Sequence, residues 1–289
     1  MPETKDKEQS SASAMGVAGF RAVETAKPPA RRLVNDPYAR AFVPGYMYWM
    51  LKPFVDTGLY DRMSQGAGTF ILLRERYIDD ALAAALAAGL DQLVLLGAGF
   101  DTRAYRVPGT EKVRIFEIDQ PATQAVKVKK LKKALGALPA NVTFLPVDFN
   151  TQSLEERLLS NGFDEKGKTF FIWQGVTYFL TAEGVDHTLA FISRHSGPGS
   201  QVIFDYFYAE MLRDESAGYV KALRRASKLS GEAYMFGIER GQVEAFMAQR
   251  GFMGVKSLSL EEVRALYLAG KDAARPVPPG IAIASAVVG

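Results

Sequence analysis

The sequence predicts an α/β protein built on a parallel, doubly wound sheet with helices on both faces. Short apolar segments alternate with longer amphipathic ones through most of the 289 residues, which is typical of parallel strands joined by helices. The first short segment, at 93–96, runs directly into a glycine-rich turn. Open α/β sheets build nucleotide-binding clefts from such a strand and turn, so this second observation supports the same fold class.

The N-terminal part is expected to form a helical cap over 15–67, preceded by a disordered tail at 1–14. The tail is polar and rich in small residues, which disfavours a packed structure. A short helix is expected at 15–25, and residues 35–37 (Asn-Asp-Pro) are typical of the cap and first turn of another helix. Residues 42–60 are rich in aromatic side chains, which either close over a ligand or pack against the main domain.

A long amphipathic helix is expected at 68–89, before the alternating strands and helices. The strands are expected at 93–96, 113–118, 142–147, 170–173 and 201–206, and the helices between them at 120–136, 153–160 and 181–195. The helix at 120–136 carries a basic run that we interpret as a solvated face, made of Lys127, Lys129, Lys130, Lys132 and Lys133.

The C-terminal part lacks a clear strand over 207–250, so a helical insertion, or lid, is expected after the fifth strand. A short sixth strand is expected at 251–257. The proline-rich connector at 276–280 cannot continue a helix, and it leads into a terminal strand of small residues at 281–288. Residues 15–289 are therefore expected to form a single domain.

Composition narrows the classes of function. The net charge is +3, which is too small an excess to predict a nucleic-acid or membrane partner. The chain has no cysteine and two histidines, which argues against disulfides, a cysteine nucleophile and a histidine-rich metal site. No apolar run reaches the roughly 18 residues of a membrane span and the polar N-terminus does not resemble a signal peptide, so we expect a cytoplasmic location.

The glycine turn predicts a nucleoside site. Gly97 and Gly99 let the backbone approach a ligand where a Cβ would clash. The second strand ends at Asp119, whose carboxylate can accept hydrogen bonds from ribose hydroxyls. A dinucleotide-binding turn usually has a third glycine where this chain has Thr102, followed by Arg103, so a pyrophosphate ligand is disfavoured. A nucleoside without phosphates fits better, and the leading candidate is S-adenosylmethionine.

Further cofactor contacts are expected at the carboxyl ends of the strands, where open sheets bind their ligands. Asp148 and Phe149 either bind the adenine amino group and ring, or act as a helix cap and a core aromatic. Arg74 either binds the methionine carboxylate through its guanidinium fork or makes a surface salt bridge. Asp101 and Arg103 either brace the turn or lie close to the cofactor.

Residues on the acceptor side are expected after the fourth strand. Gln174 ends this strand, and we expect it to contact the cofactor and to help position the acceptor, together with Tyr178. An aromatic residue at such a junction is also a common core residue. His187 is the only nearby candidate base, although its distance from the strand end favours a structural role. His195 is interpreted as a residue at a helix C-terminus.

Several motifs of the chain occur together in one known family. The segments are 35–39, 74–80 (which reads Arg-Glu-Arg-Tyr-Ile-Asp-Asp), 95–103, 116–121 and 173–180. As a set they resemble the leucine carboxyl methyltransferase family, and most closely its bacterial S-adenosylmethionine-dependent O-methyltransferases. The resemblance extends over about 15–206 of the chain.

The resemblance implies a Rossmann-like, seven-stranded methyltransferase sheet. It also implies that Arg74 binds the cofactor carboxylate, that the two glycines lie along the methionine, and that Asp119 binds the ribose. Many relatives have glutamate where this chain has Gln174, which leaves the polar contact of this position open. Residues 207–289 resemble the family less and are expected to decide the acceptor.

The expected reaction is in-line attack by an acceptor oxygen on the sulfonium methyl, which leaves S-adenosylhomocysteine. We expect a carboxylate of a small molecule as the acceptor, because it is ionised at neutral pH and needs no base. A phenol or alcohol of a natural product is the alternative, and it would need a base or a metal. A non-catalytic S-adenosylmethionine-binding protein and a dehydrogenase that binds NAD are the other hypotheses.

Overall fold

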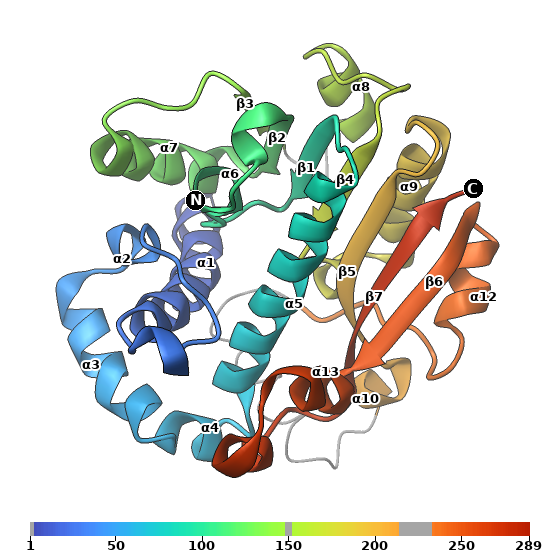
Figure 1. Cartoon of the computed structure of the whole chain (residues 1–289). Helices are drawn as coiled ribbons and strands as arrows, with labels where there is room; N and C mark the ends of the chain where they lie inside the picture. The colour runs from blue at the N-terminus through green and yellow to red at the C-terminus, as the bar shows by residue number, and fades with distance from the viewer. Residues whose placement is uncertain (1–2, 148–151, 214–232) are drawn as a thin grey trace.

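The structure is a computed structural model that describes residues 3–147, 152–213 and 233–289. The predicted adenine contacts Asp148 and Phe149 lie outside the described residues, as does the middle of the predicted insertion. The described parts form an α/β fold around one sheet (Figure 1).

The sheet has seven strands in the order β3-β2-β1-β4-β5-β7-β6, which confirms the predicted fold class. Each strand falls within two residues of its predicted range, because each is a short apolar run with turn residues at its ends. The strands are β1 (Gln92–Leu96), β2 (Arg114–Asp119), β3 (Val142–Pro146), β4 (Thr169–Trp173), β5 (Gln201–Phe207), β6 (Phe252–Ser259) and β7 (Ile281–Val288).

The expected parallel arrangement holds for most of the sheet but not at one edge. Strands β1 to β5 pair in parallel, but β7 lies between β5 and β6 and is antiparallel to both. The chain passes from β6 to β7 through the short helix α13 (Leu260–Tyr267), which does not cross the sheet. This connection, 260–280, is also long enough for a parallel crossover, so its length does not decide the direction of β7. The alternation of apolar residues specifies a buried face and carries no information on strand direction.

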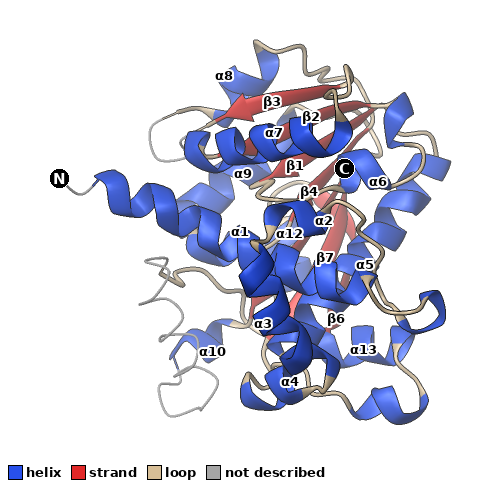
Figure 2. Ribbon diagram, turned by 90° about the vertical axis from the view of Figure 1, so that its left-hand side faces the viewer, coloured by secondary structure: helices blue, strands red, loops and turns tan. Residues whose placement is uncertain are grey.

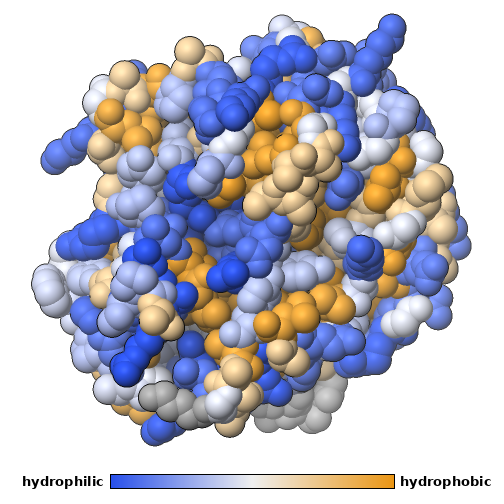
Figure 3. Space-filling view, in the orientation of Figure 1, coloured by the Kyte–Doolittle hydropathy of each residue, from blue (hydrophilic) through white to orange (hydrophobic). Residues whose placement is uncertain are grey.

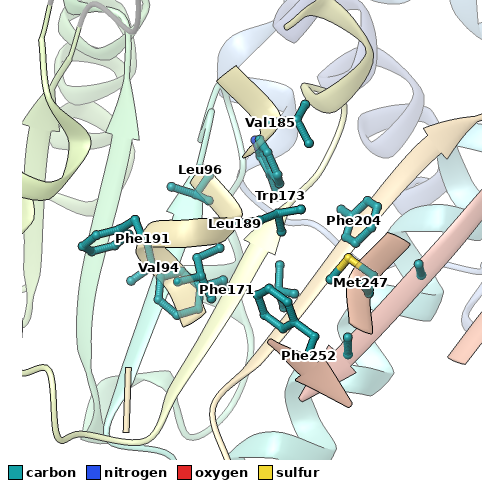
Figure 4. Packing of buried hydrophobic residues seen from close by; sticks show 14 of the residues in the cluster. Val94, Leu96, Phe171, Trp173, Val185, Leu189, Phe191, Phe204, Met247 and Phe252 are labelled. Atoms are coloured by element: carbon teal, nitrogen blue, oxygen red, sulfur yellow. The ribbon is translucent and has the colours of Figure 1, made fainter. Parts of the chain in front are cut away.

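Helices cover both faces of the sheet, as predicted. Leu93 and Leu95 of β1 contribute to the core on one face, as the two-residue period of a strand requires, whereas Val94 and Leu96 contribute to the core on the other, which Figure 4 shows. The first face is covered by α5 (Ala67–Ala87), α6 (Arg103–Arg106), α7 (Pro121–Leu135) and α13, and the second by α8 (Leu154–Leu159), α9 (Ala182–Arg194) and α12 (Val243–Ala248).

The N-terminal helices gather beside the sheet (Figure 1), and Figure 2 looks onto them. The helix predicted at 15–25 is the C-terminal half of α1 (Glu3–Thr25), which begins within the segment expected to be a disordered tail. The other N-terminal helices are α2 (Ala39–Phe42), α3 (Gly45–Asp56) and α4 (Leu59–Met63). Buried residues of α1 and α2 pack against Phe100 of the glycine turn and Leu131 of α7. The division into tail, cap and single domain stays a prediction.

The α-helix α13 in the C-terminal part was not predicted from the sequence. Helix α13 begins with a capping box, in which Ser259 and Glu262 exchange side-chain and backbone hydrogen bonds. The Ser-x-x-Glu spacing is the signal that could have found it. Of the predicted insertion, the structure describes α10 (Ala209–Arg213) and α12 as helices.

No helix of the described residues is long and apolar enough to cross a membrane. On the face shown in Figure 3, hydrophobic residues lie in patches separated by hydrophilic ones. Separate patches of this kind are normal for a folded surface and require no partner to explain them.

Candidate active site

A cleft of about 910 Å³ lies at the carboxyl ends of β1, β2 and β4. Its walls come from α1, α5, the glycine turn, the segment that follows β4, and residues 233–235. Small-molecule sites have volumes of roughly 300–1,000 Å³, so this cleft can hold a nucleoside and a second small molecule.

The glycine turn is pressed against the segment that follows β4. Gly97 has a φ of +67° and Gly99 a φ of +42°, both in the left-handed region that disfavours other residues. A Cβ added to Gly97 would lie less than 3.0 Å from Cγ2 of Val176, whereas one on Gly99 would lie 3.4 Å from Cβ of Ala14. Gly97 is therefore required both by its conformation and by the space around it.

Asp119 lies at the end of β2 and lines the cleft, as predicted. Its Oδ2 accepts a hydrogen bond from the N–H of Gly99, and its Oδ1 accepts one from the N–H of Gln120 at 2.6 Å. Burial raises the pKa of Asp119, although these two backbone donors and Lys127 oppose the rise. The carboxylate is thus fixed beside the glycine turn.

Arg74 lines the cleft and is almost completely buried, so a surface salt bridge was the wrong alternative for it. Its Nη1 lies 2.6 Å from Oδ2 of Asp205 and 3.4 Å from the hydroxyl of Tyr178. Burial alone would lower the pKa of Arg74, but Asp205 and Tyr178 raise it above its usual value, so the guanidinium stays charged. Its Nε has no hydrogen-bond partner among the described residues.

Asp205 is a site residue that sequence reasoning missed. This carboxylate is fully buried in β5, and it joins Arg74 to the segment after β4. Its Oδ1 accepts the N–H of Gly175 at 2.7 Å, and its backbone oxygen accepts the hydroxyl of Thr177 at 2.6 Å. The signal was a lone acid inside an apolar strand, since a buried carboxylate requires a charged or hydrogen-bonding partner.

Gln174 points its amide nitrogen towards α5. Its Nε2 donates to Oε1 of Glu75 at 2.7 Å, whereas its Oε1 is buried without a hydrogen-bond partner among the described residues. Burial would raise the pKa of Glu75, but the cations Arg103, Arg21 and Arg106 lower it strongly. Gln174 therefore links the cleft to a carboxylate whose pKa is lowered by three arginines.

Asp101 and Arg103 both brace the turn, and Asp101 also lines the cleft, so the two alternatives for this pair coexist. Arg103 is fully buried and also pairs with Glu75 at 2.6 Å and with Asp79 at 2.7 Å. Burial would raise the pKa of Asp101, but the Arg103 guanidinium lowers it below its usual value. From α1, Arg21 donates to the backbone oxygen of Phe100 and so ties the N-terminal helices to the turn.

The solvated interpretation of the basic run was wrong for Lys127. This side chain is 1% exposed, and its Nζ lies 2.7 Å from Oε2 of Glu117 on β2. Tyr105 donates to the other carboxylate oxygen of Glu117 at 2.8 Å. Since Lys127 Nζ also lies 3.4 Å from the backbone oxygen of Ala98, the ion pair supports the glycine turn from behind.

Tyr178 contacts Arg74 through its hydroxyl and also lines the cleft, where its ring lies among other aromatic side chains. His187 is exposed on α9 and is not among the residues that line the cleft. His195 follows the end of α9, as predicted, where it stacks on Phe191 and pairs with Glu165.

Solved structures with the same fold include methyltransferases. A "putative methyltransferase" from Thermobifida fusca matches with a TM-score of 0.58 over 94% of each chain, at 14% sequence identity. A DUF574 family protein from Streptomyces avermitilis matches with a TM-score of 0.58 over 95% of this chain and 97% of the other, at 12% identity. At these identities the likeness shows the fold alone.

Sequence comparison identifies the family. A Bacillus subtilis protein, YktD, is 31% identical over 202 residues, which cover 69% of this chain and 66% of that protein. A Rhodococcus jostii protein is 31% identical over 275 residues, which cover 92% of this chain and 88% of that protein. Both carry the name "Putative S-adenosyl-L-methionine-dependent methyltransferase". The leucine carboxyl methyltransferase family model matches residues 14–193, and the chain therefore belongs to this family of methyltransferases, whose methyl donor is S-adenosylmethionine.

Proposed function

We propose that the protein is an O-methyltransferase that converts a carboxylate of a small molecule into its methyl ester. The observation that carries this proposal is the distribution of charge in the cleft. The charged residues among its described lining are Arg21, Arg74, Asp101 and Asp119, and each is held by an ion pair or by backbone hydrogen bonds. These four residues already make ion pairs or backbone hydrogen bonds, so none of them is available as a general base.

The residues of the cleft fit the amino-acid portion of S-adenosylmethionine. That portion carries a carboxylate, which needs donors, and an ammonium, which needs acceptors. Arg74 Nε is a buried donor without a partner and Gln174 Oε1 is a buried acceptor without one, both counted over the described residues. Unpaired buried polar atoms are costly, so a ligand that satisfies both would be favoured. We assign the carboxylate to Arg74, the ammonium to Gln174 and the ribose to Asp119, and Asp148 and Phe149 remain the proposed adenine contacts.

The chain's own residues would act by positioning and by excluding water. When bound, S-adenosylmethionine supplies a methyl group on a positively charged sulfur. Phe70 and Tyr178 contact Arg74, and Phe207 packs on Tyr178, so these rings of the cleft lining would keep this region poorly hydrated. A carboxylate acceptor is already ionised at neutral pH. The negative carboxylate and the positive sulfonium both lose their charge in the reaction, so a site that excludes water favours the transfer. Alignment of the acceptor oxygen would supply much of the acceleration.

Replacement of His187 by alanine is expected to leave kcat/KM within about twofold of the wild-type value, because a carboxylate acceptor needs no base. Initial rates of methyl transfer measured at several acceptor concentrations check this. If His187 were a general base for a phenol or alcohol, the same variant would lose roughly 100-fold or more. A loss of that size would contradict the carboxylate proposal.

Cofactor affinity is expected to weaken with acidification at a pH above the usual Asp pKa of about 3.9, because burial raises the pKa of Asp119. Protonation removes acceptor capacity that ribose hydroxyls require, so the Kd for S-adenosylhomocysteine should rise as pH falls through this raised pKa. The pKa values of Glu75 and Asp101 are lowered, so these groups stay ionised in that range.

Calorimetric titration of wild type and Asp119→Asn at a series of pH values measures this dependence. The variant should bind more weakly at neutral pH and should lack the rise in Kd on acidification. Parallel pH profiles of the two proteins would show that Asp119 does not bind the ribose. Glu117 also has a raised pKa, but it is present in both proteins and cancels from the comparison.

Calorimetry with S-adenosylmethionine, followed by a methyl-release assay over a panel of small acids, phenols and alcohols, tests the proposed function. Binding with turnover of acids is the expected result. Turnover of phenols or alcohols alone would replace the carboxylate by a hydroxyl acceptor. Binding without turnover of any panel member would favour a non-catalytic role.

A further inference from the structure

The cleft separates polar from apolar groups. Its charged lining residues lie on α1, on α5 at Arg74, in the glycine turn and at the end of β2. The lining residues in 60–71, in 178–180, at the end of β5 and in 233–235 carry no charge, and they are Tyr60, Ser64, Ala67, Phe70, Ile71, Tyr178, Phe179, Leu180, Phe207, Ala233, Tyr234 and Met235. We call this part of the cleft the aromatic compartment. Phe70 lies at its border, where its ring centre is 4.6 Å from the guanidinium carbon of Arg74.

Four rings of the aromatic compartment form one contiguous wall. The ring centre of Tyr178 lies 4.7 Å from that of Phe179, 4.8 Å from that of Phe207 and 5.6 Å from that of Tyr234. The Phe179 and Tyr234 rings are 5.0 Å apart with their planes tilted by 35°. Phe179 and Tyr234 are the partly exposed rings of the wall, whereas Tyr178 and Phe207 are buried, so a further aromatic ring would pack mainly on Phe179 and Tyr234.

Backbone contacts hold the segments that carry these rings in place. The N–H of Met235 donates to the backbone oxygen of Tyr178 at 2.8 Å, which fixes the chain around Tyr234 against the segment after β4. Phe207 is buried at the end of β5, two residues after Asp205. One ring of the wall, Phe207, and the Asp205 carboxylate of the ion pair thus lie on the same strand, which fixes the positions of these two residues relative to each other.

We propose that the acceptor is a carboxylic acid carried on a planar aromatic ring system, with the rings against this wall and the carboxylate directed to the polar end of the cleft. The inference rests on the proposed function and specifies its substrate class. A carboxylate left within the aromatic compartment would lose its hydration without meeting a cation among the described lining residues there. At the polar end, the same charge lies beside the positive sulfur.

The chemistry of the transfer agrees with this orientation. One bond forms, between an acceptor oxygen and the methyl carbon, and one breaks, between that carbon and sulfur, whose electron pair stays on sulfur. No proton changes place, so the apolar surroundings of the rings need supply no base. The planar body contributes binding and alignment.

Binding of four probes to the S-adenosylhomocysteine-loaded protein tests the inference without requiring turnover. The probes are 2-naphthoate, the saturated decahydro-2-naphthoate, 2-naphthol and the linear dicarboxylate suberate, each titrated by calorimetry. We expect 2-naphthoate to bind about tenfold or more tightly than suberate and several-fold more tightly than the saturated acid, which has the same skeleton without planarity. Equal or tighter binding of suberate or of the saturated acid would overturn the inference.

Phe179→Leu tests the wall itself. Loss of the ring contact should weaken 2-naphthoate binding roughly two- to tenfold, while the Kd for S-adenosylhomocysteine remains unchanged. Phe246→Leu is the matched control, because Phe246 is a half-buried aromatic residue on α12 that does not line the cleft. An unchanged affinity of Phe179→Leu for 2-naphthoate, or an equal loss in the control, would contradict the role of the wall.

The same titrations distinguish failure of the inference from failure of the proposed function. If 2-naphthol binds as tightly as 2-naphthoate and both exceed suberate, the aromatic compartment is supported and the carboxylate preference is not. If S-adenosylhomocysteine itself does not bind, the cofactor assignment fails before any acceptor is tested, and the inference falls with it.

Discussion

Replacement of Arg74 by methionine is expected to raise the Kd for S-adenosylhomocysteine about 100-fold, because it removes charge-assisted hydrogen bonds to the amino-acid carboxylate. The unpartnered Nε of Arg74 is the donor that the ligand would satisfy. Isothermal titration calorimetry of the two proteins gives the change directly. The affinity for 5′-methylthioadenosine, which lacks the amino-acid portion, should stay the same.

The Arg74 variant needs a control for stability. Loss of the Arg74 guanidinium leaves the Asp205 carboxylate buried without a cation. In typical proteins such a change lowers the free energy of unfolding by about 3–5 kcal/mol. Arg74→Met combined with Asp205→Asn removes both charges, and it should recover much of the melting temperature without recovering affinity for S-adenosylhomocysteine. Two results would show that Arg74 affects binding only by stabilising the fold. One is recovery of S-adenosylhomocysteine affinity in the double variant, and the other is an equal loss of affinity for 5′-methylthioadenosine in the single variant.

Replacement of Gly97 by alanine is expected to weaken cofactor binding about 100-fold or more, because the added Cβ strains the turn and displaces it. The Cβ would lie less than 3.0 Å from Cγ2 of Val176, in a residue with a φ of +67°. The turn and the segment after β4 would have to separate, and both line the cleft. Binding of S-adenosylhomocysteine and thermal unfolding should both be measured.

Gly89→Ala separates conformational strain from close approach. Gly89 has a φ of +80°, but a Cβ there meets no atom within 4 Å, and the residue lies before β1, at the end of the strand away from the cleft. Both variants should lose about 1 to 2 kcal/mol of stability to left-handed strain, but only Gly97→Ala should lose affinity. Unchanged binding in Gly97→Ala would mean that the turn does not contact the cofactor.

Much of the fold could be predicted because its signals are local. The short apolar runs of β1 to β5 and the turn residues between them fix which segments are strands, and the glycine turn after β1 marks the edge that binds ligands. The direction of β7 could not be predicted, because it follows from which strand β7 pairs with. Helix α13 was missed although its capping box is visible in the sequence.

The site was predicted less completely, since its electrostatics depend on distant partners. Arg74 and Asp205 are 131 positions apart, and only folding brings them together in one ion pair. In the sequence Lys127 is one of five lysines of the basic run. In the structure it is the buried one, and it pairs with Glu117 of β2. A charge pattern along one helix identifies candidate surface residues but does not identify a buried counter-charge on another element.

The most direct test of carboxylate methylation uses an acceptor that carries both a carboxylate and a phenol. The protein is incubated with S-adenosylmethionine and 6-hydroxy-2-naphthoate, and the singly methylated product is isolated and treated with mild alkali before mass spectrometry. Methyl transfer to the carboxylate gives a methyl ester, which alkali converts back to the starting acid. A methyl ether, which survives the same treatment, would contradict the carboxylate proposal.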